Sequence, residues 1–518
     1  DAIAGYVHTG FSVQPVECET LSAEDALALG RSLAPVVDAG ARADDSSDLP
    51  RSVSLLHLIG TDLGHEPGAV LGRWQETNSI LSGPRASSSI GKARPNLRAV
   101  IGQGSSEPFA LDLRADGPHA LVGGTTGSGK SEFLQAWVLG LATAHSPQRV
   151  SFLFVDYKGG SAFADCVNLP HTVGLVTDLS QHLVRRALTS LRAELTFREH
   201  LLNRKGYKDL IELERSGDPE VPPSLLIIVD EFAALVNEVP EFVDGVVDVA
   251  QRGRSLGLHL ILATQRPAGV IRDNLRANTN LRVALRMADE DDSSDVLGTP
   301  IAAGFDPALP GRAAAKTGPG RIRGFQSGYA GGWTSDRPEP SRVVIEELNF
   351  GLPATWEPPK DPEAEAAKES VSQGPTDIKR IVGVVQAAAR EAQIPEPRKP
   401  WLPVLADSYD YSKLPSKRTD DELVLGVTDD ARQQAQPTVS YFPDRDGNVA
   451  IIGTGGSGKS TALRTIAVAS AVTVRGGPVH VYGLDFAGGG LQMLESLPHV
   501  GSIVAGDDEE IGRASCRE

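Results

Sequence analysis

Ala120-Leu-Val-Gly-Gly-Thr-Thr-Gly-Ser-Gly-Lys-Ser131 has the pattern of a short apolar strand that turns through a glycine-rich loop into a helix. The loop fits GxxxxGK[ST] in full, and its glycines let backbone N–H groups approach a triphosphate closely. The N-terminus of the following helix adds its dipole. We expect Lys130 to reach the β- and γ-phosphates and Ser131 to ligate Mg²⁺. The predicted cofactors are ATP and Mg²⁺, and the predicted ATP-binding residues are Gly124, Thr125, Thr126, Gly127, Ser128, Gly129, Lys130 and Ser131.

The same block recurs 329 residues later, since 453 − 124 = 329. The block Asp156-Tyr-Lys-Gly-Gly160 recurs as Asp485-Phe-Ala-Gly-Gly489, again at 485 − 156 = 329. A Leu-Pro-His tripeptide ends at residues 171 and 499, an offset of 328. Matched blocks in one order predict two modules, of which the second is truncated. Its predicted ATP-binding residues are Gly453, Thr454, Gly455, Gly456, Ser457, Gly458, Lys459 and Ser460.

Apolar runs alternate with helix-permissive stretches along both modules. This alternation predicts an α/β fold of tandem P-loop (RecA-like) modules, each a mainly parallel sheet flanked by helices. The expected strands are 120–122, 150–155, 225–229, 258–263 and, in the second module, 449–452. The expected helices are 132–143, 181–202, 363–371, 377–391 and 461–472.

An acidic pair, Asp230-Glu231, follows the apolar strand at 225–229. The carboxyl end of a parallel strand lies beside the P-loop in this fold class, so Asp230 is expected to hold Mg²⁺ through its water shell. Glu231 is the candidate base that polarises the attacking water. The alternative, in which the pair only caps the next helix, stays open.

Two further polar positions are candidates for catalysis. Gln265 follows the strand at 258–263 and is placed to sense the γ-phosphate, although an ordinary strand-to-turn transition also fits. A developing phosphate charge is stabilised by an arginine, and Arg254 is the candidate to act on a neighbouring subunit, with Arg252 second. The weaker candidates are Arg185, Arg186, Arg282 and Arg286, and a plain surface arginine remains the alternative for all of them.

Hydrophobic residues make up 40% of the chain and charged residues 23%, which is ordinary for a globular protein. The net charge of −17 argues against a generally basic surface for DNA, although a locally basic pore remains compatible with it. Cys18, Cys166 and Cys516 form no CxxC pair, which favours a reducing compartment.

No apolar run is long enough to span a membrane, and the chain begins at Asp1, so we expect missing upstream sequence in which an anchor could lie. The last eight residues, back-translated, spell a sequencing-adapter read and are expected to be an artefact. The expected organisation is an upstream tail or packing segment at 1–60, a first ATPase module at 61–350, a Pro-rich and helical connector at 351–400, the start of a second module at 401–510, and the artefact at 511–518.

The blocks VGGTTGSGKSE, FVDYKGGSAF, LPHTVGLVTDL, LLIIVDEFAAL and RGRSLGLHLILATQRP, in this order, resemble the FtsK/SpoIIIE family of P-loop ATPases. The fit is closest to the EccC-like branch, the motors of type VII secretion. The stretches DNLRANTNLRVALRMADEDDSSDVLG and PGRAAAKTGPGR are similar to that branch as well.

This resemblance implies membrane helices ahead of two or three ATPase modules, and a hexameric ring whose sites are completed by a neighbour's arginine. It implies secreted helical proteins and secretion-membrane components as partners, and a location at the cytoplasmic face of the plasma membrane. Carried over residue by residue, it assigns the P-loop to Gly124–Ser131, the acidic pair to Asp230 and Glu231, and the trans arginine to Arg254.

Three functions are compatible with these motifs. The first is an ATP-hydrolysing motor for protein export, which the tandem modules favour. The second is a double-stranded DNA translocase of the same family. The third is a nucleotide-binding scaffold without turnover, which the intact Asp230-Glu231 pair disfavours.

Overall fold

The computed structural model describes residues 3–9, 12–18, 22–33, 49–84, 86, 95–156, 161–177, 181–238, 240–267, 278–318, 320–335, 374–400, 402, 404–415, 419–473, 479–486 and 489–506. The expected helix at 363–371, most of the Pro-rich connector, the Tyr157–Gly160 part of the first glycine block and the terminal octapeptide at 511–518 lie outside these ranges. The chain divides into two compact units, Asp1–Leu49 and Pro50–Glu518.

In its described residues, the first unit contains an antiparallel hairpin followed by a helix. Strand β1 (Ile3–Thr9) pairs with β2 (Ser12–Cys18), and helix α1 (Ala23–Leu33) follows. The unit ends earlier than the boundary expected at residue 60, because α2 (Leu55–Ile59) buries its apolar side chains in the core of the second unit.

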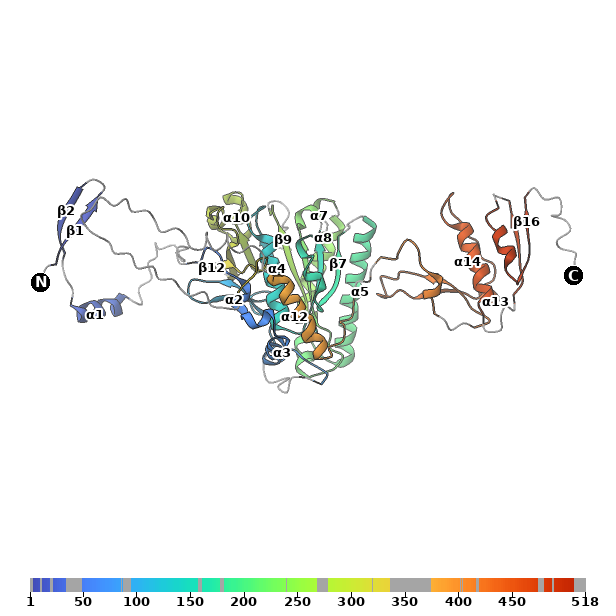
Figure 1. Cartoon of the computed structure of the whole chain (residues 1–518), viewed down its shortest axis with the longest axis horizontal. Helices are drawn as coiled ribbons and strands as arrows, with labels where there is room; N and C mark the ends of the chain where they lie inside the picture. The colour runs from blue at the N-terminus through green and yellow to red at the C-terminus, as the bar shows by residue number, and fades with distance from the viewer. Residues whose placement is uncertain are drawn as a thin grey trace. The chain divides into compact units, whose positions relative to one another are not determined.

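A ten-stranded mixed sheet forms the centre of the second unit (Figure 1), in the order β4-β3-β12-β11-β10-β5-β9-β8-β6-β7. Its parallel half contains β10 (Leu281–Leu285), β5 (His119–Gly123), β9 (Leu258–Thr264), β8 (Ser224–Asp230), β6 (Val150–Asp156) and β7 (Thr172–Val176). Its antiparallel half contains β11 (Arg312–Gly318), β12 (Arg321–Ser327), β3 (Arg98–Gln103) and β4 (Pro108–Asp112). This architecture confirms the predicted α/β fold with a largely parallel sheet.

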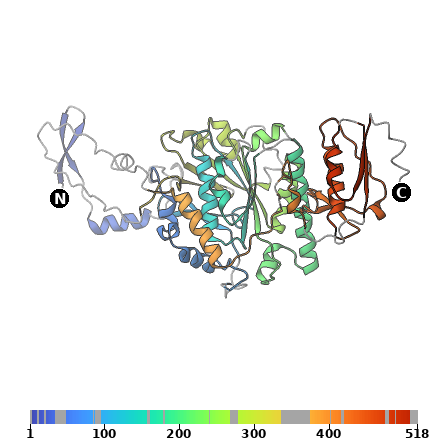
Figure 2. The same cartoon turned by 45° about the vertical axis from the view of Figure 1, so that its right-hand side comes forward.

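Successive residues of the buried strands face two different cores, as the pleat requires. Ala120 and Val122 belong to one core, whereas Leu121 belongs to the other. Helices α3 (Pro67–Glu76), α4 (Lys130–Ala144) and α12 (Asp377–Glu391) cover the first face. Helices α5 (Gln181–Lys205), α6 (Leu210–Arg215), α7 (Phe232–Glu238), α8 (Pro240–Leu256) and α10 (Glu290–Leu297) contribute to the second. In Figure 2 the sheet lies between α12 in orange and α5 in green.

Helix α12 has the bounds that its apolar spacing predicts, but it does not behave as a connector. Its side chains Ile381, Val385 and Ala388 are fully buried in the core that α3 and α4 also line. Asp377 accepts hydrogen bonds from the backbone N–H and the hydroxyl of Thr334, which fastens the start of the helix. The described part of the expected 351–400 connector is therefore structurally part of the first module.

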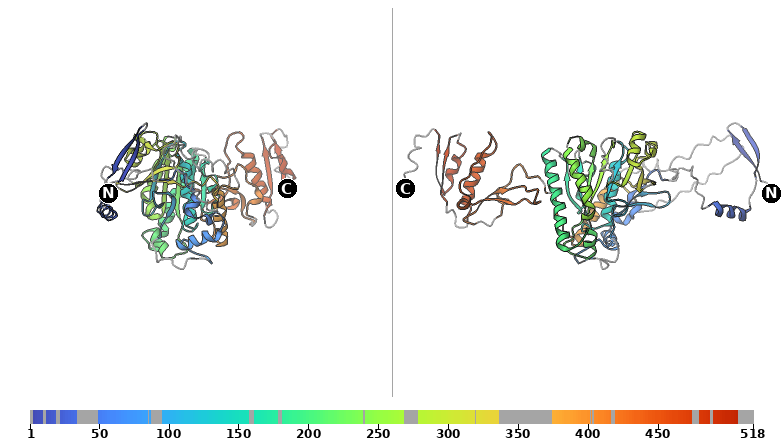
Figure 3. Two further views of the ribbon diagram at one scale, coloured as in Figure 1. Left: turned by 60° about the vertical axis from the view of Figure 1, so that its left-hand side comes forward. Right: turned by 180° about the vertical axis from the view of Figure 1, so that it is seen from behind.

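The second module begins with β13 (Leu423–Val427), β14 (Thr438–Tyr441) and the short helix α13 (Pro443–Asp446). Helix α14 (Lys459–Ala471) then precedes the parallel pair β15 (Val481–Asp485) and β16 (Val500–Ala505), all coloured orange to red in Figure 3. Asp429 on the loop after β13 ion-pairs with Arg186 of α5, so this segment contacts the first module.

The strand predicted at 449–452 is wrong, because these residues form no strand and Ile452 is 93% exposed. Its counterpart β5 is held between β9 and β10. Shifted by the repeat offset, β9 would fall at 258 + 329 = 587, beyond residue 518. An apolar run becomes a strand only when neighbours accept its backbone hydrogen bonds, and this sequence does not supply them here.

Within the part of the chain that the structure describes, no helix is both long and apolar enough to cross a bilayer.

Candidate nucleotide site

The first P-loop has the geometry that its glycines permit. Gly127 and Gly129 have φ values of 74° and 90°, in the left-handed region that favours glycine. A Cβ on Gly129 would lie 2.6 Å from the backbone N of Gly311, and one on Gly124 would lie 2.7 Å from Ser128 Oγ. The loop therefore wraps tightly because these positions carry no side chain.

The ends of three strands fasten this loop from outside. The N–H of Gly124 donates to the carbonyl of Thr264, the last residue of β9, at 3.2 Å, and the N–H of Thr125 donates to the carbonyl of Arg286 after β10 at 3.0 Å. On the other side, the N–H of Gly311 donates to the carbonyl of Ser128 at 2.8 Å. The remaining backbone N–H groups of the loop and of the first turn of α4 can donate to a phosphate.

Lys130 meets the acidic pair at the end of β8. Its Nζ donates to Asp230 Oδ1 at 2.5 Å and lies 4.0 Å from Glu231 Oε2. All three side chains are nearly fully buried, with Lys130 5% exposed. The parallel arrangement of β5, β9 and β8 brings residues a hundred positions apart into one cluster.

Glu231 itself has an uncommon backbone conformation. Its φ of 59° lies in the left-handed region, which costs a residue with a Cβ about 1–2 kcal/mol. Its N–H donates to Asp230 Oδ1 at 3.0 Å, which fixes the turn from β8 into α7. Conformational strain of this kind is frequent where a side chain must be aimed at a ligand.

Gln265 connects the P-loop to the acidic pair. Its Oε1 accepts from Thr126 Oγ1 at 3.3 Å, and its backbone N–H donates to Glu231 Oε1 at 3.4 Å. The position between the two motifs is the one expected for a residue that senses the terminal phosphate. Its role in sensing stays a prediction.

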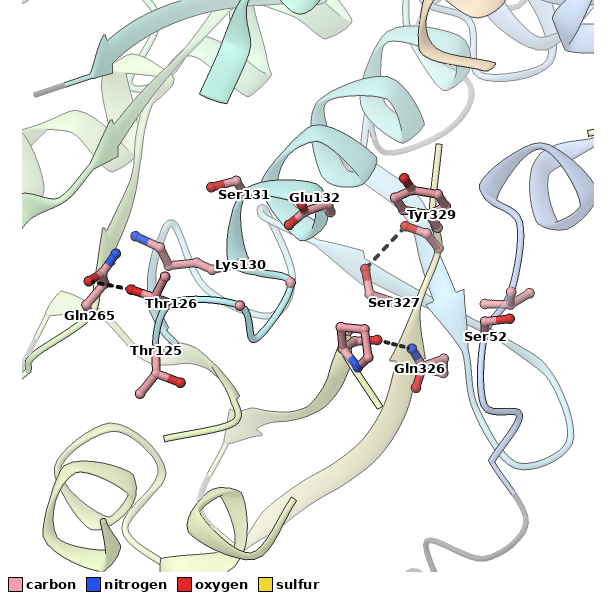
Figure 4. A pocket seen from close by; sticks show the side chains of 16 residues that line it. Ser52, Thr125, Thr126, Lys130, Ser131, Glu132, Gln265, Gln326, Ser327 and Tyr329 are labelled. Atoms are coloured by element: carbon pink, nitrogen blue, oxygen red, sulfur yellow. Dashed lines mark hydrogen bonds between the residues drawn. The ribbon is translucent and has the colours of Figure 1, made fainter. Parts of the chain in front are cut away.

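A cavity of about 510 Å³ opens over the P-loop (Figure 4). In this view Gln265 and Lys130 lie at one end, Ser131 and Glu132 in the middle, and Ser327, Tyr329 and Ser52 at the other end. The lining residues are Ser52, Val53, Thr125, Thr126, Gly127, Gly129, Lys130, Ser131, Glu132, Gln265, Pro310, Gly311, Gln326, Ser327, Gly328 and Tyr329. Sequence reasoning missed the residues from 52–53 and 310–329, which approach the loop only through the antiparallel half of the sheet.

The oxygen atoms available near Lys130 suit Mg²⁺. Ser131 lines the cavity with a hydroxyl, and Asp230 supplies a carboxylate 2.5 Å from Lys130 Nζ. Mg²⁺ is typically held by one or two such oxygens together with the phosphates of the nucleotide. Among the described residues, no group of three or more His, Cys, Asp or Glu side chains could hold a metal without such help.

Arg254 lies away from the P-loop of its own chain. It lies in the last turn of α8 shortly before β9, at the end of the parallel strands opposite the one that carries Gly124. There it lines a second cavity of about 360 Å³ together with Asp209, Gln251 and His259. In its own chain Arg254 lines a different cavity from the P-loop, so both its expected action on a neighbouring subunit and the plain surface arginine stay open as predictions.

The other candidate arginines occupy different positions. Arg252 ion-pairs with Glu199 at 2.5 Å, and Arg186 is engaged with Asp429. Arg282 donates to the carbonyl of Thr279. Arg286 is the one that approaches the P-loop, with Nη2 3.5 Å from the carbonyl of Thr126.

The two glycine blocks, 156–160 and 485–489, each begin with an aspartate whose side chain accepts a hydrogen bond from a backbone N–H later in the chain. Asp156 Oδ2 accepts from the N–H of Ala162 at 3.3 Å, and Asp485 Oδ2 accepts from the N–H of Leu491 at 2.9 Å. Both acceptors lie six residues before their donors, so the repeat extends to side-chain contacts. A role of Lys158 lies outside the described residues.

The second P-loop repeats the backbone of the first. Gly456 and Gly458 have φ values of 76° and 89°. Lys459 folds back, however, and donates to the carbonyls of Gly453 at 2.8 Å and Thr454 at 2.5 Å. Among the described residues, no acidic side chain ion-pairs with it.

A strand, glycine loop and helix whose lysine meets an acidic pair at the end of β8, a parallel strand separated from β5 by β9, define the site of a P-loop ATPase. A sequence profile described as the FtsK/SpoIIIE family matches residues 85–270 and 414–515. These ranges make up more than half of the chain, and the chain belongs to the FtsK/SpoIIIE family. The membership predicted from the five sequence blocks is confirmed.

The relatives of this chain include proteins of secretion systems. It is 35% identical over 478 residues to the ESX secretion system protein EccC of Geobacillus thermodenitrificans (strain NG80-2), covering 90% of this chain and 31% of that protein. It is 36% identical over 429 residues to the type VII secretion system protein EssC of Staphylococcus aureus (strain NCTC 8325 / PS 47), covering 79% of this chain and 29% of that protein. The chain thus spans about a third of the length of these curated relatives.

Two solved structures resemble the chain. The cytoplasmic domain of the Thermomonospora curvata type VII secretion ATPase EccC has a TM-score of 0.66 and 28% identity, covering 88% of this chain and 50% of that one. EssC (ATPases 2 and 3) from Geobacillus thermodenitrificans has a TM-score of 0.58 at 17% identity, covering 82% of this chain and 72% of that one. The second likeness concerns the fold alone.

Proposed function

We propose that this chain is the ATPase part of a type VII secretion protein, which hydrolyses ATP at its first P-loop to drive protein export. The similarity to EccC and EssC over most of the chain supports the secretion context. Lys130 at the start of α4 meets Asp230 and Glu231 at the end of β8, and Gln265 follows β9 beside them. This assembly is the observation that carries the proposal of hydrolysis.

Each group in the first site has a chemical task in this proposal. The backbone of Gly124–Ser131 and Lys130 bind the phosphates, and Ser131, together with Asp230 through the water shell, would hold Mg²⁺. Bound Mg²⁺ would supply charge neutralisation of the phosphates. Glu231 accepts a proton from the attacking water, and Gln265 orients that water or senses the γ-phosphate.

The second P-loop, Gly453–Ser460, is proposed to bind a nucleotide as well. Its loop conformation supports binding, since it repeats the φ values of the first loop. The proposed assembly is a hexameric ring of copies in which Arg254 of one chain acts on the nucleotide of the next. Its proposed partners are secreted helical proteins and membrane components of the secretion system, at the cytoplasmic face of the plasma membrane.

The test of hydrolysis is phosphate release by the whole chain over a range of protein concentrations, because an arginine supplied in trans requires assembly. Glu231→Gln should lower the turnover by roughly 10²–10⁴-fold while nucleotide binding persists, since the amide cannot accept a proton. Glu290→Gln, an exposed acid at the start of α10, is the matched control and should leave turnover unchanged. Equal phosphate release by wild type and Glu231→Gln would instead indicate a scaffold without turnover.

The test of the transported substrate uses the same assay with added ligands. A helical secretion-signal peptide should change the turnover of the chain, whereas double-stranded DNA should not. Stimulation by DNA and indifference to the peptide would favour the DNA translocase of the same family.

A further inference from the structure

The segment Gly328-Tyr-Ala-Gly-Gly-Trp333 follows β12, and its first two residues line the cavity. Tyr329 lies at the end of the cavity opposite Gln265 (Figure 4). None of the P-loop motifs accounts for it. A nucleotide whose γ-phosphate lies near Lys130 must extend its ribose and base along the cavity, past Ser131 and Glu132. The end lined by Tyr329 is therefore where the base would lie.

The backbone of Tyr329 is held in place by an early segment of the module. Its N–H donates to the carbonyl of Val53 at 2.8 Å, and its carbonyl accepts from the N–H of Leu55 at 2.9 Å. The preceding Gly328 donates to the carbonyl of Ile101 at 2.9 Å. Three fixed hydrogen bonds make this a rigid position in a loop rather than a free surface residue.

The ring of Tyr329 rests against glycine backbone. A Cβ on Gly331 would lie 2.5 Å from the Tyr329 hydroxyl oxygen, and a Cβ on Gly332 would lie 3.5 Å from a ring carbon. The side chain is nevertheless 51% exposed and lines the cavity. One side of the ring is thus supported by glycine residues, while the rest stays open to a ligand.

The nearby aromatic residue Trp333 differs from Tyr329 in its position and in its contacts. Trp333 is 41% exposed, but it does not line the cavity, and the guanidinium carbon of Arg380 lies 5.9 Å from its ring centroid. Among the described residues, no cation–π contact of this kind involves Tyr329. A supported, uncharged ring in a nucleotide cavity has the chemistry that a purine needs for stacking.

We propose that Tyr329 is the platform on which the base of the bound nucleotide stacks, and that Gly331 and Gly332 are required to keep its ring in position. This inference rests on the proposed binding of ATP at Gly124–Ser131. Tyr329 is a positioning residue for the base and takes no part in phosphate chemistry.

The experiment separates base binding from phosphate binding by comparing ATP with inorganic tripolyphosphate. Both ligands are titrated calorimetrically onto the whole chain carrying Lys459→Ala, which removes the lysine of the second P-loop. Tyr329→Ala should weaken ATP binding by roughly 10- to 100-fold, about 1.4–2.8 kcal/mol at 1.4 kcal/mol per tenfold, and leave tripolyphosphate affinity within about twofold. Tyr329→Phe should retain ATP affinity, because the ring is kept.

Two further variants and a kinetic readout sharpen the result. Gly331→Val should reproduce the loss, because its side chain would displace the ring, whereas Trp333→Ala should not affect ATP affinity. In turnover assays Tyr329→Ala should raise the KM for ATP and leave kcat nearly unchanged. Its thermal unfolding midpoint is measured alongside, to separate loss of the platform from loss of fold.

The possible failures are distinguishable. Equal loss of ATP and tripolyphosphate affinity in Tyr329→Ala would overturn the inference, since the residue would then shape the P-loop. Unchanged ATP affinity would overturn it as well. Failure of the parent chain to bind either ligand would contradict the proposed nucleotide site itself.

Discussion

The two P-loops of this chain have nearly the same sequence and the same backbone, yet their lysines have different surroundings. The paired glycines have φ values of 74° and 90° in the first loop and 76° and 89° in the second. Lys130 is buried against Asp230, whereas Lys459 donates to carbonyls of its own loop. The eight-residue motif therefore determines the backbone conformation of the loop, but it does not determine which side chains and carbonyls contact its lysine.

The difference comes from the strands that flank each loop. In the first module β8, β9 and β10 bring Asp230, Thr264 and Arg286 to the loop. At the repeat offset, counterparts of these strands would fall beyond residue 518. A short stretch of sequence can thus specify the loop that binds a nucleotide. Hydrolysis requires additional residues that the strands of the sheet bring to that loop.

The largest expected effect is on stability, through the buried lysine. Lys130→Met should lower the free energy of unfolding of the first module by about 3–5 kcal/mol, because it leaves buried carboxylates without their cation. The matched Lys459→Met should cost less than about 0.5 kcal/mol, since that side chain is not ion-paired. In a Trp401→Phe background, tryptophan fluorescence during urea unfolding reports on the first module and the connector, because the four remaining tryptophans precede residue 401. An equal loss in the free energy of unfolding for Lys130→Met and Lys459→Met would contradict the proposed difference between the two lysine environments.

An intermediate effect is expected on the pH dependence of stability. It involves the histidine of the Leu-Pro-His tripeptide, which occurs in both modules. Burial lowers the pKa of His171 from 6.5 to about 4. The unfolded chain therefore binds a proton more readily, so the stability of the first module should fall as the pH drops from 6.5 toward 4, by up to about 1.4 kcal/mol per pH unit. His171→Gln keeps a donor for the carbonyl of His145 and should flatten this slope.

The control for this pH effect is the equivalent substitution in the second module. In the same Trp401→Phe background, His499→Gln should leave the tryptophan-reported slope unchanged, because no tryptophan then remains in the second module. His145 and His259, whose pKa values burial lowers to about 3, contribute to the same slope and remain in both variants. A slope that does not change in His171→Gln would show that these other histidines account for it.

The smallest expected effect concerns the single position at which the two P-loop sequences differ, Thr126 in the first loop and Gly455 in the second. Thr126→Gly makes the first loop identical to the second and removes the hydrogen bond to Gln265. Loss of one such bond should lower ATP turnover by roughly 2- to 10-fold. Steady-state phosphate release measures this, with Gly455→Thr in the second loop as the reverse change, expected to have no effect. A fall as large as that of Glu231→Gln would mean that Thr126 shapes the whole loop.

Several elements could be predicted from sequence because their patterns are local. The strands β5, β6, β8 and β9 lie within one residue of the predicted ranges, since continuous apolar runs are typical of strands buried on both faces. Strand β11 was not predicted, because Ala313, Ala314 and Ala315 favour a helix by propensity. Pairing with β10 and β12 overrides that preference.

By itself the sequence determined the repeat, the wrap of both P-loops, the parallel strands and the acidic pair, because glycine spacing and apolar runs act over a few residues. Only the tertiary structure decided that Lys130 meets Asp230, that Arg254 lies at the opposite edge of the sheet, and that Tyr329 borders the cavity. It also placed α12 in the core and left 449–452 without a strand partner. The physical reason is that strand order and antiparallel pairing depend on partners distant in the chain, which no local pattern specifies.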